Sequence, residues 1–466
     1  AVLVAGAICI GLCLFGIRGR MGYNPIKVSQ AYYCEDPFLN QLGVNPVFNL
    51  LTSTLDDNRK ENRTLHLMSE EDALSKVQKY LHRQGIDRLS PIARKVEREG
   101  TPNRRNVVLV FMESMSANLM GTFGSDKKLT PYLDSLYQQS LSFSHFYSSG
   151  IHTNHGIYST LYSFPAIMKR NAMKGSVIPV YSGLPTVLQE NGYCNLFFMT
   201  HESQYDNMNA FLRTNGFDEI YAQENYPSEK VVNSFGVQDD FMYQYALPIL
   251  NERAGTGNPF FSVLLSISNH PPYVIPPYFH PHSDVLEEQI VEYADWSIRQ
   301  FMQAAEKQPW FDNTIFVFLG DHGKMVGTPE CEMPQSYNHI PLMIYGKDIK
   351  PGVYDGFGGQ VDVSPTLLGL LNISYLQNNF GVNLLEEERP CMFFTADNLI
   401  GARDSVNMFI YSPDSQQEFK YKLEEGKLHA ATGTDEEAFR NLKDYCFSML
   451  QSTESLVKEH KTLDKV

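Results

Sequence analysis

The sequence predicts an α/β fold with a doubly wound, mostly parallel sheet that is flanked by helices. Residues 106–112 and 315–319 are nearly continuous apolar runs, which is typical of parallel strands buried on both faces. Helical patterns such as 184–191 and 287–306 separate these runs from further apolar runs. Strands that alternate with helices in this way predict a parallel sheet covered on both faces.

The remaining elements extend this pattern and then change character near the C-terminus. Further parallel strands are expected at 193–200, 260–267 and 341–345, and helices at 157–163 and after Thr130, where proline takes the first helical position. From Pro390 onward, shorter runs at 408–411, 418–423 and 427–430 predict a small antiparallel subdomain, and 435–456 predicts a final amphipathic helix.

Composition limits the class of protein. The chain has 466 residues, of which 43% are hydrophobic, so a large core is available. The net charge of −15 excludes nucleic acid as an expected partner, because basic patches are sparse. The seven cysteines show no metal-binding spacing and no disulfide framework.

Residues 1–17 form an uncharged hydrophobic run that Arg18 and Arg20 terminate. Its length is just short of the roughly 20 residues that a membrane span needs. A signal-peptide core and a buried helix are the alternatives, and we favour the end of a transmembrane helix. We expect four parts: this segment at 1–17, a helical connector at 18–104 with an N-capped helix after Ser69, the main α/β domain at 105–400 and a C-terminal subdomain at 401–466.

Acidic residues stand where the two central strands should end. Glu113 follows the first apolar run, and Asp321-His322 follows the second after a glycine. Ligands bind at the carboxyl ends of strands in open α/β sheets, and carboxylate and imidazole groups are ligands for divalent metals. A capped loop at Asp321 without metal is the plain alternative.

Thr153 is a candidate nucleophile between His152 and His155. It stands at the start of an expected helix, where backbone N–H groups and the helix dipole favour a phosphoryl oxygen. A threonine hydroxyl needs a base or a metal to become nucleophilic. An N-cap threonine without any chemistry is the alternative reading.

Taken together, Glu113, Thr153 and Asp321-His322 resemble the alkaline phosphatase and sulfatase superfamily, specifically its lipoteichoic acid synthase-like branch. The strings Leu-Thr-Pro-Tyr-Leu-Asp at 129–134 and Gly-Gln-Val-Asp-Val-Ser-Pro-Thr-Leu-Leu at 359–368 also carry this resemblance. The resemblance implies one divalent cation, with Mn²⁺ expected first and Mg²⁺ or Zn²⁺ as alternatives.

The resemblance also assigns residue roles. Glu113, Asp321 and His322 would be metal ligands, and Thr153 would be both ligand and nucleophile. His270 and His201 match substrate-binding histidines, with His270 also catalytic. His339 is a further candidate for substrate binding, and the roles of His152 and His155 stay open.

Two differences from the motifs of the superfamily restrict the activities that we expect of this chain. The string after Thr153 (Asn-His-Gly-Ile) lacks the Pro and Arg of true sulfatases, which argues against sulfate-ester hydrolysis. The Trp and Arg that glycerol-phosphate polymerases carry after the position of His201 are replaced by Tyr205-Asp206-Asn207-Met208. Because such an arginine clamps a phosphate with two hydrogen bonds, its absence weakens the expectation of a phosphoglycerol substrate.

The resemblance implies a phosphotransferase. It would move a phospholipid head group, of phosphoglycerol type, through phospho-Thr153 to a hydroxyl of a glycan or glycolipid. Phosphoethanolamine transfer and phosphodiester hydrolysis are the alternatives, and a catalytically silent membrane-tethered binding protein is the alternative from another class. We expect a multi-pass membrane protein whose catalytic domain is extracytoplasmic.

Overall fold

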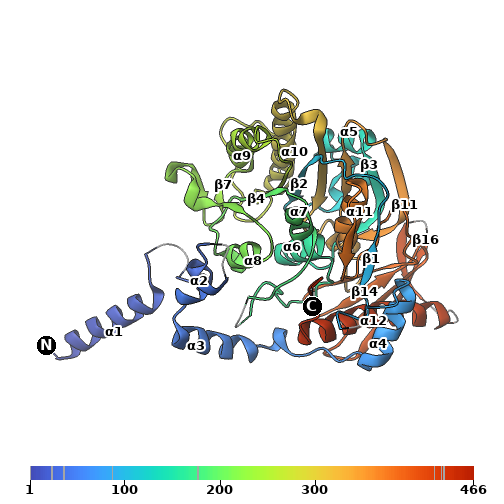
Figure 1. Cartoon of the computed structure of the whole chain (residues 1–466), viewed down its shortest axis with the longest axis horizontal. Helices are drawn as coiled ribbons and strands as arrows, with labels where there is room; N and C mark the ends of the chain where they lie inside the picture. Colours follow the sequence, from blue (N-terminus) through green and yellow to red (C-terminus); the bar gives the residue numbers. More distant parts are fainter. Residues whose placement is uncertain are drawn as a thin grey trace.

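The computed structural model describes residues 2–21, 25–34, 37–86, 88–175, 178–424, 426–431, 433 and 436–465. Ala1, where the expected membrane segment begins, and Asp435, where the expected last helix begins, lie outside the described residues. Figure 1 shows a large α/β body, with the N-terminal helices extending from one side of it.

An eight-stranded mixed sheet forms the centre of this body, in the order β11-β3-β10-β9-β2-β8-β4-β5. The strands from β9 to β5 run parallel, and β10 is antiparallel to both of its neighbours. The predicted mostly parallel sheet is therefore confirmed, but the strand expected to run parallel at 341–345 is wrong in direction, because β10 is antiparallel. In sheet order the strands span Gly352–Gly359, Leu141–Tyr147, Leu342–Tyr345, Thr314–Gly320, Asn106–Met112, Phe260–Leu265, Cys194–Met199 and Glu219–Tyr221.

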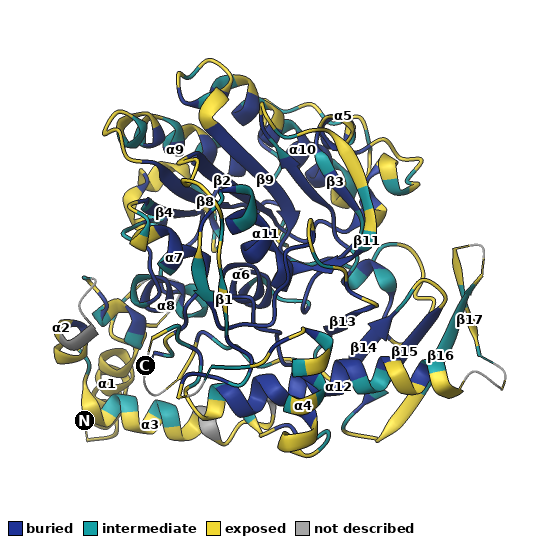
Figure 2. Ribbon diagram, turned by 45° about the vertical axis from the view of Figure 1, so that its right-hand side comes forward, coloured by how far each residue is buried: buried dark blue, intermediate teal, exposed yellow. Residues whose placement is uncertain are grey.

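Helices cover both faces of the sheet, as the apolar strands require. Val107, Leu109 and Phe111 of β2 join one core, while Val108 and Val110 join the other. The first face carries α6 (Thr153–Tyr162), α7 (Leu184–Glu190), α8 (Met208–Thr214) and α11 (Val363–Leu370). The second face carries α5 (Pro131–Gln139), α9 (Asp239–Ala254) and α10 (Leu286–Ala305). Figure 2 shows β2 and β9 buried between these layers.

A second, antiparallel sheet follows toward the C-terminus. Its five strands lie in chain order: Met392–Thr395 (β13), Ile400–Arg403 (β14), Asn407–Ser412 (β15), Gln417–Glu424 (β16) and Lys427–Ala430 (β17). The last three strands were predicted and are confirmed, whereas β13 and β14 were not predicted. The final helix α12 (Glu436–Lys458) packs on this sheet and on α4. Two short two-stranded sheets pair β1 (Arg94–Val96) with β12 (Tyr375–Gln377), and β6 (Val231–Asn233) with β7 (Gly236–Val237).

The N-terminal part consists of α1 (Val2–Arg18), α2 (Pro37–Leu42), α3 (Pro46–Asp57) and α4 (Glu70–Tyr80). The predicted cap of α4 is confirmed, because the Ser69 hydroxyl accepts the Asp72 N–H at 3.3 Å. The apolar side chains of α1 are exposed. Within the described ranges, no helix combines the length and apolarity that crossing a bilayer requires.

Candidate metal centre and nucleophile

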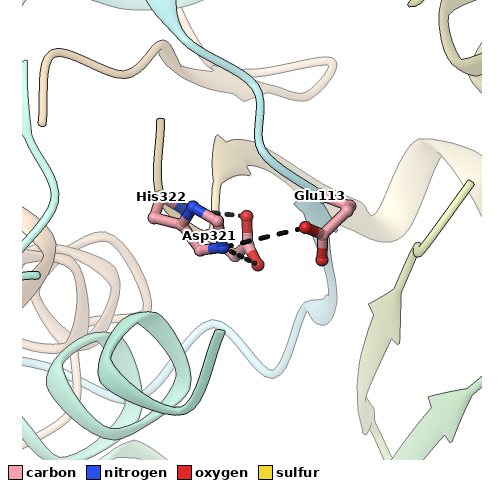
Figure 3. A group of neighbouring side chains, drawn as sticks. All are labelled: Glu113, Asp321 and His322. Atoms are coloured by element: carbon pink, nitrogen blue, oxygen red, sulfur yellow. Dashed lines mark hydrogen bonds and ion pairs between the residues drawn. The ribbon is translucent and has the colours of Figure 1, made fainter. Parts of the chain in front are cut away.

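Glu113, Asp321 and His322 meet at the carboxyl edge of the sheet. Strands β2 and β9 are parallel neighbours with Met112 opposite Gly320, so both chains leave the sheet at the same edge. One ligand atom from each of the three side chains lies within 4.8 Å of the others. Figure 3 shows the two carboxylates and the imidazole ring turned toward one another.

The two carboxylates are buried, and the described residues do not donate a hydrogen bond to every one of their oxygen atoms. Glu113 accepts the Ser114 hydroxyl at 2.7 Å, and Asp321 Oδ1 accepts the Ser114 and His322 N–H groups at 2.8 and 2.7 Å. Asp321 Oδ2 is buried and has no hydrogen-bond partner within the described residues. Burial, and second the charge of Asp321, raise the pKa of Glu113 well above its ordinary value.

The ring of His322 is oriented for metal binding. Its Nδ1 lies 2.8 Å from the Gly323 carbonyl oxygen, which can only accept a hydrogen bond, so Nδ1 carries the proton. The unprotonated Nε2 then faces the carboxylates, at 3.7 Å from Glu113 Oε1 and 3.5 Å from Asp321 Oδ2. The donor set of two carboxylates and one imidazole, with an orphaned carboxylate oxygen, fits a divalent cation.

Thr153 is the first residue of α6, and its hydroxyl lies 3.4 Å from Glu113 Oε2. Two contacts hold the start of α6 against Asp321. A Cβ on Gly156 would lie 2.2 Å from the Asp321 carbonyl oxygen, so only glycine permits this approach. Gln360 donates to that same oxygen at 2.7 Å and accepts the Ser149 N–H at 2.9 Å.

His270 lies close enough to His322 and Asp321 for their charges to act on it, and His201 lies close enough to His270 for the same effect. The His270 Nδ1 pairs with the Pro271 carbonyl at 2.6 Å, which leaves Nε2 as the acceptor. Burial lowers the pKa of His270, and the nearby charge of His322 lowers it further. His201 is buried, its ring lies 4.7 Å from that of Tyr205, and its Nε2 has no partner in the described part of the chain.

The remaining predicted histidines have other contacts. His339 pairs with the Ser144 carbonyl at 2.9 Å and stacks on Tyr147, which ties it to β3 and away from the groups described above. His152 Nε2 lies 2.6 Å from Asp397 Oδ1. His155 is buried against the Arg170 carbonyl at 3.0 Å, and burial lowers its pKa to about 3.

Several residues at the site were not identified from the sequence. Lys324 donates to Asn269 Oδ1 at 2.6 Å, and Asn269 donates to the Glu113 carbonyl at 3.0 Å. Burial lowers the pKa of Lys324 to about 8. Lys324 directly follows Asp321-His322-Gly323, and this position next to the expected metal ligands is the sequence feature that could have identified it.

A basic hollow of about 490 Å³ opens beside Thr153. His152 and Asn154, which flank Thr153 in the sequence, are among its lining residues. Asp206 lies in its wall, where it accepts Asn154 Nδ2 at 2.9 Å and Lys174 Nζ at 3.4 Å. The other cationic residues of the wall are Arg59, Lys169 and Arg170.

The fold and this site define an enzyme of the alkaline phosphatase superfamily. The family model described as Sulfatase matches residues 105–373, more than half of the chain, and the chain therefore belongs to the sulfatase family. The resemblance to the lipoteichoic acid synthase-like branch is confirmed by relatives that carry this name. One is the lipoteichoic acid synthase-like protein YvgJ of Bacillus subtilis, which is 25% identical over 70% of this chain and 56% of its own length.

Another curated relative and two solved structures point to the same family and fold. The lipoteichoic acid synthase of Staphylococcus aureus is 24% identical over 76% of this chain and 58% of its own length. The chain thus spans little more than half the length of these curated relatives. A solved protein of the alkaline phosphatase superfamily from Vibrio parahaemolyticus has a TM-score of 0.77 and 25% identity, covering 86% of this chain and 99% of its own. The lipoteichoic acid synthase LtaP of Listeria monocytogenes has the same fold, with a TM-score of 0.67, 22% identity and coverage of 83% and 98%.

Proposed function

We propose that this chain is the catalytic part of a metal-dependent phosphotransferase. It takes the head group of a phospholipid, of phosphoglycerol type, and transfers it through phospho-Thr153 to a hydroxyl of a glycan or glycolipid at the outer face of a membrane. The observation that carries the proposal is the Thr153 hydroxyl, which lies 3.4 Å from Glu113 at the start of α6 and beside Asp321 and His322.

Glu113, Asp321 and His322 would hold the cation, with Thr153 as a fourth ligand. A bound divalent cation, Mn²⁺ in our expectation, supplies positive charge that lowers the pKa of a hydroxyl and neutralises a phosphoryl group. The chain itself contributes the orientation. The short distance between Gly156 and Asp321 fixes the Thr153 oxygen, and the N–H groups at the start of α6 face the phosphoryl oxygens.

In the first step the Thr153 oxygen attacks phosphorus, and the bond from phosphorus to the diacylglycerol oxygen breaks. The Thr153 hydroxyl loses a proton and the leaving oxygen gains one, and we assign this transfer to His270, whose Nε2 is not used by the Pro271 contact and can accept the proton before it delivers it. His201 binds a phosphoryl oxygen or hydroxyl of the head group through its unpartnered Nε2. In the second step the acceptor hydroxyl attacks phosphorus, its proton leaves, and the Thr153 oxygen is released and reprotonated.

Phosphoethanolamine transfer is the second candidate, and Asp206 favours it. A carboxylate occupies the segment in which the glycerol-phosphate polymerases carry arginine, and it lies in the wall of the hollow beside Asn154. A carboxylate attracts the ammonium group of ethanolamine, whereas it would not attract a glycerol head group.

Turnover of a chromogenic phosphodiester tests the proposal. We expect cleavage that requires Mn²⁺, stops with a chelator and exceeds phosphomonoester and sulfate-ester cleavage. Thr153→Ala should lower kcat/KM by about a thousandfold or more, while Thr153→Ser should retain measurable activity. A silent binding protein would show no cleavage with any metal, and that outcome would sink the proposal.

A further inference from the structure

A second, larger hollow lies between the N-terminal helices and the catalytic body. Its volume is about 800 Å³, which is within the range of pockets that bind small molecules. Its walls come from the end of α1, residues 25–28, α3, and Lys174, Gly175 and Ile178. Figure 1 shows that α1 extends away from the body and that only its C-terminal end approaches α3.

The lining of this hollow is largely apolar. Phe48 and Thr52 of α3 and Ile178 of the catalytic body are among its lining residues. The other apolar side chains that line the hollow are Leu14, Ile17, Pro25, Ile26, Val28 and Leu55. We refer to this space below as the apolar hollow.

The apolar hollow adjoins the basic hollow beside Thr153. Ser53, Arg59, Lys174 and Gly175 line both spaces, so the two meet at these residues. The lining of the basic hollow also includes His152 and Asn154, the neighbours of Thr153. An amphiphilic molecule could therefore extend from the nucleophile into apolar surroundings without leaving the protein.

Positive charge is concentrated where the two hollows meet. Arg18 and Lys27 line the apolar hollow, and Arg59 and Lys174 line both spaces. Loss of hydration, and second the charge of Lys174, lower the pKa of Lys27. Like charges held close together favour an anion between them.

We propose that the apolar hollow binds the acyl chains of a glycerophospholipid whose phosphate lies in the basic hollow. The inference deepens the proposed function and rests on it. From the apolar hollow toward Thr153, the lining is first apolar and then cationic, and the path ends near the proposed nucleophile. This is the order of acyl chains, phosphate surroundings and scissile bond in an anionic phospholipid donor. Each methylene group that such a site removes from water contributes about 0.8 kcal/mol.

A substitution that fills the apolar hollow tests whether acyl chains bind there. The two substrates are dioleoyl phosphatidylglycerol in detergent micelles and a water-soluble chromogenic phosphodiester without acyl chains. The readout is the ratio of their kcat/KM values. Thr52→Trp places a large ring in the apolar hollow, and we expect this ratio to fall by about tenfold or more. Val406→Trp, on an exposed aliphatic residue outside both hollows, should leave the ratio within about twofold of wild type.

A second measurement does not depend on a substitution. Wild-type protein is irradiated with a phosphatidylglycerol that carries a diazirine on its acyl chain, and the labelled peptides are mapped. Labels are expected on the lining residues of α3 between 48 and 55, and on Lys174, Gly175 or Ile178. Labels confined to residues 2–13 of α1, or to the exposed Val47, Leu50 and Leu51, would mean that the helices only contact the micelle, and would overturn the inference.

The two proposals fail in different ways. If Thr52→Trp leaves the ratio unchanged while wild type consumes the lipid, the acyl-chain site is wrong and the proposed function stands. If wild type cleaves the chromogenic diester and consumes no phospholipid, the lipid donor is wrong and the acyl-chain site is overturned with it.

Discussion

At the scale of single residues, the paired carboxylates of Glu113 and Asp321 are the strongest sign of chemistry. Two buried carboxylates side by side destabilise a fold unless protons or cations compensate them. Ser114 offers only one side-chain and one backbone hydrogen bond to the pair, and Asp321 Oδ2 is left without a partner in the described residues. A divalent cation would satisfy the remaining oxygens and explain why both acids are tolerated here.

Lys324 should act as the cation that binds the substrate phosphate near the metal ligands. It is held by Asn269 at 2.6 Å and lies over the Tyr273 ring at 5.7 Å. We expect Lys324→Met to lower kcat/KM for a chromogenic phosphodiester by about 10- to 100-fold, and Lys324→Arg to recover part of the loss. Steady-state kinetics checks this, and equal activity of Lys324→Met and wild type would contradict it.

His339 should make stability depend on pH. Burial lowers its folded-state pKa to about 4, below the unfolded value of 6.5. The unfolded state therefore takes up a proton first as the pH falls. The contribution of His339 is complete above about pH 6.5 and is lost as the pH falls toward 4, with a loss of at most roughly 3 kcal/mol.

His339→Gln removes this titration. The unfolding free energy of wild type should therefore fall more steeply than that of the variant between pH 6.5 and 4. Urea unfolding at several pH values measures both slopes. If the unfolding free energy depends on pH equally in wild type and in the variant, His339 does not titrate in this way. If the variant also loses activity, His339 has a role in binding the substrate.

At the scale of elements, the packing of α6 on the end of β9 positions Thr153, the proposed nucleophile. A Cβ at residue 156 would meet the Asp321 carbonyl oxygen at 2.2 Å, so Gly156→Ala must push α6 away from the metal ligands. Because a displacement of about 1 Å can cost 10²-fold in rate, we expect kcat to fall by about 100-fold. Chromogenic phosphodiester turnover measures the effect.

Gly255→Ala is the matched control. Gly255 directly follows α9, its φ is −67°, and a Cβ at this position would come no closer than 3.3 Å to a neighbouring atom. The variant should keep its activity within about twofold. Equal activity of the two alanine variants would show that α6 does not need its close approach to Asp321.

The elements that the sequence predicted well are those with one dominant pattern. Strands β2 and β9 are apolar along their full length because both faces are buried. Strand β3 was missed because Ser142 and Ser144 interrupt its apolar pattern. Strand β11 was missed because four of its eight residues are glycine, and nothing local indicates that β10 runs antiparallel.

The residues of the site also fall into those that the sequence identified and those that it did not. Glu113, Thr153 and Asp321-His322 stand out because each follows a strand or opens a helix, and the structure brings all four side chains together. Asn269 and Asp397 could not be found, because their relation to the site exists only through contacts between distant segments. Their local sequence carries no pattern that separates them from ordinary loop residues.

At the scale of the whole molecule, a buried ion pair joins the two sheets. Arg389 binds Asp362 at 2.6 and 2.8 Å, and it also donates to Tyr445 of α12 at 2.8 Å. Asp362 lies directly before α11, so this contact links the catalytic body to the C-terminal subdomain. Arg389→Met should lower the unfolding free energy by about 3–5 kcal/mol, because it leaves Asp362 buried and unpaired. A loss below about 1 kcal/mol in urea unfolding would contradict this.

The central claim is that Thr153 carries the head group between donor and acceptor. The most direct measurement is peptide mass spectrometry of wild-type protein after incubation with Mn²⁺ and a mixture of phosphatidylglycerol and phosphatidylethanolamine, without acceptor. We predict a glycerol-phosphate adduct on Thr153, or a phosphoethanolamine adduct if Asp206 selects that head group. Donor consumption without an adduct at Thr153, or an adduct on another residue, would contradict the account.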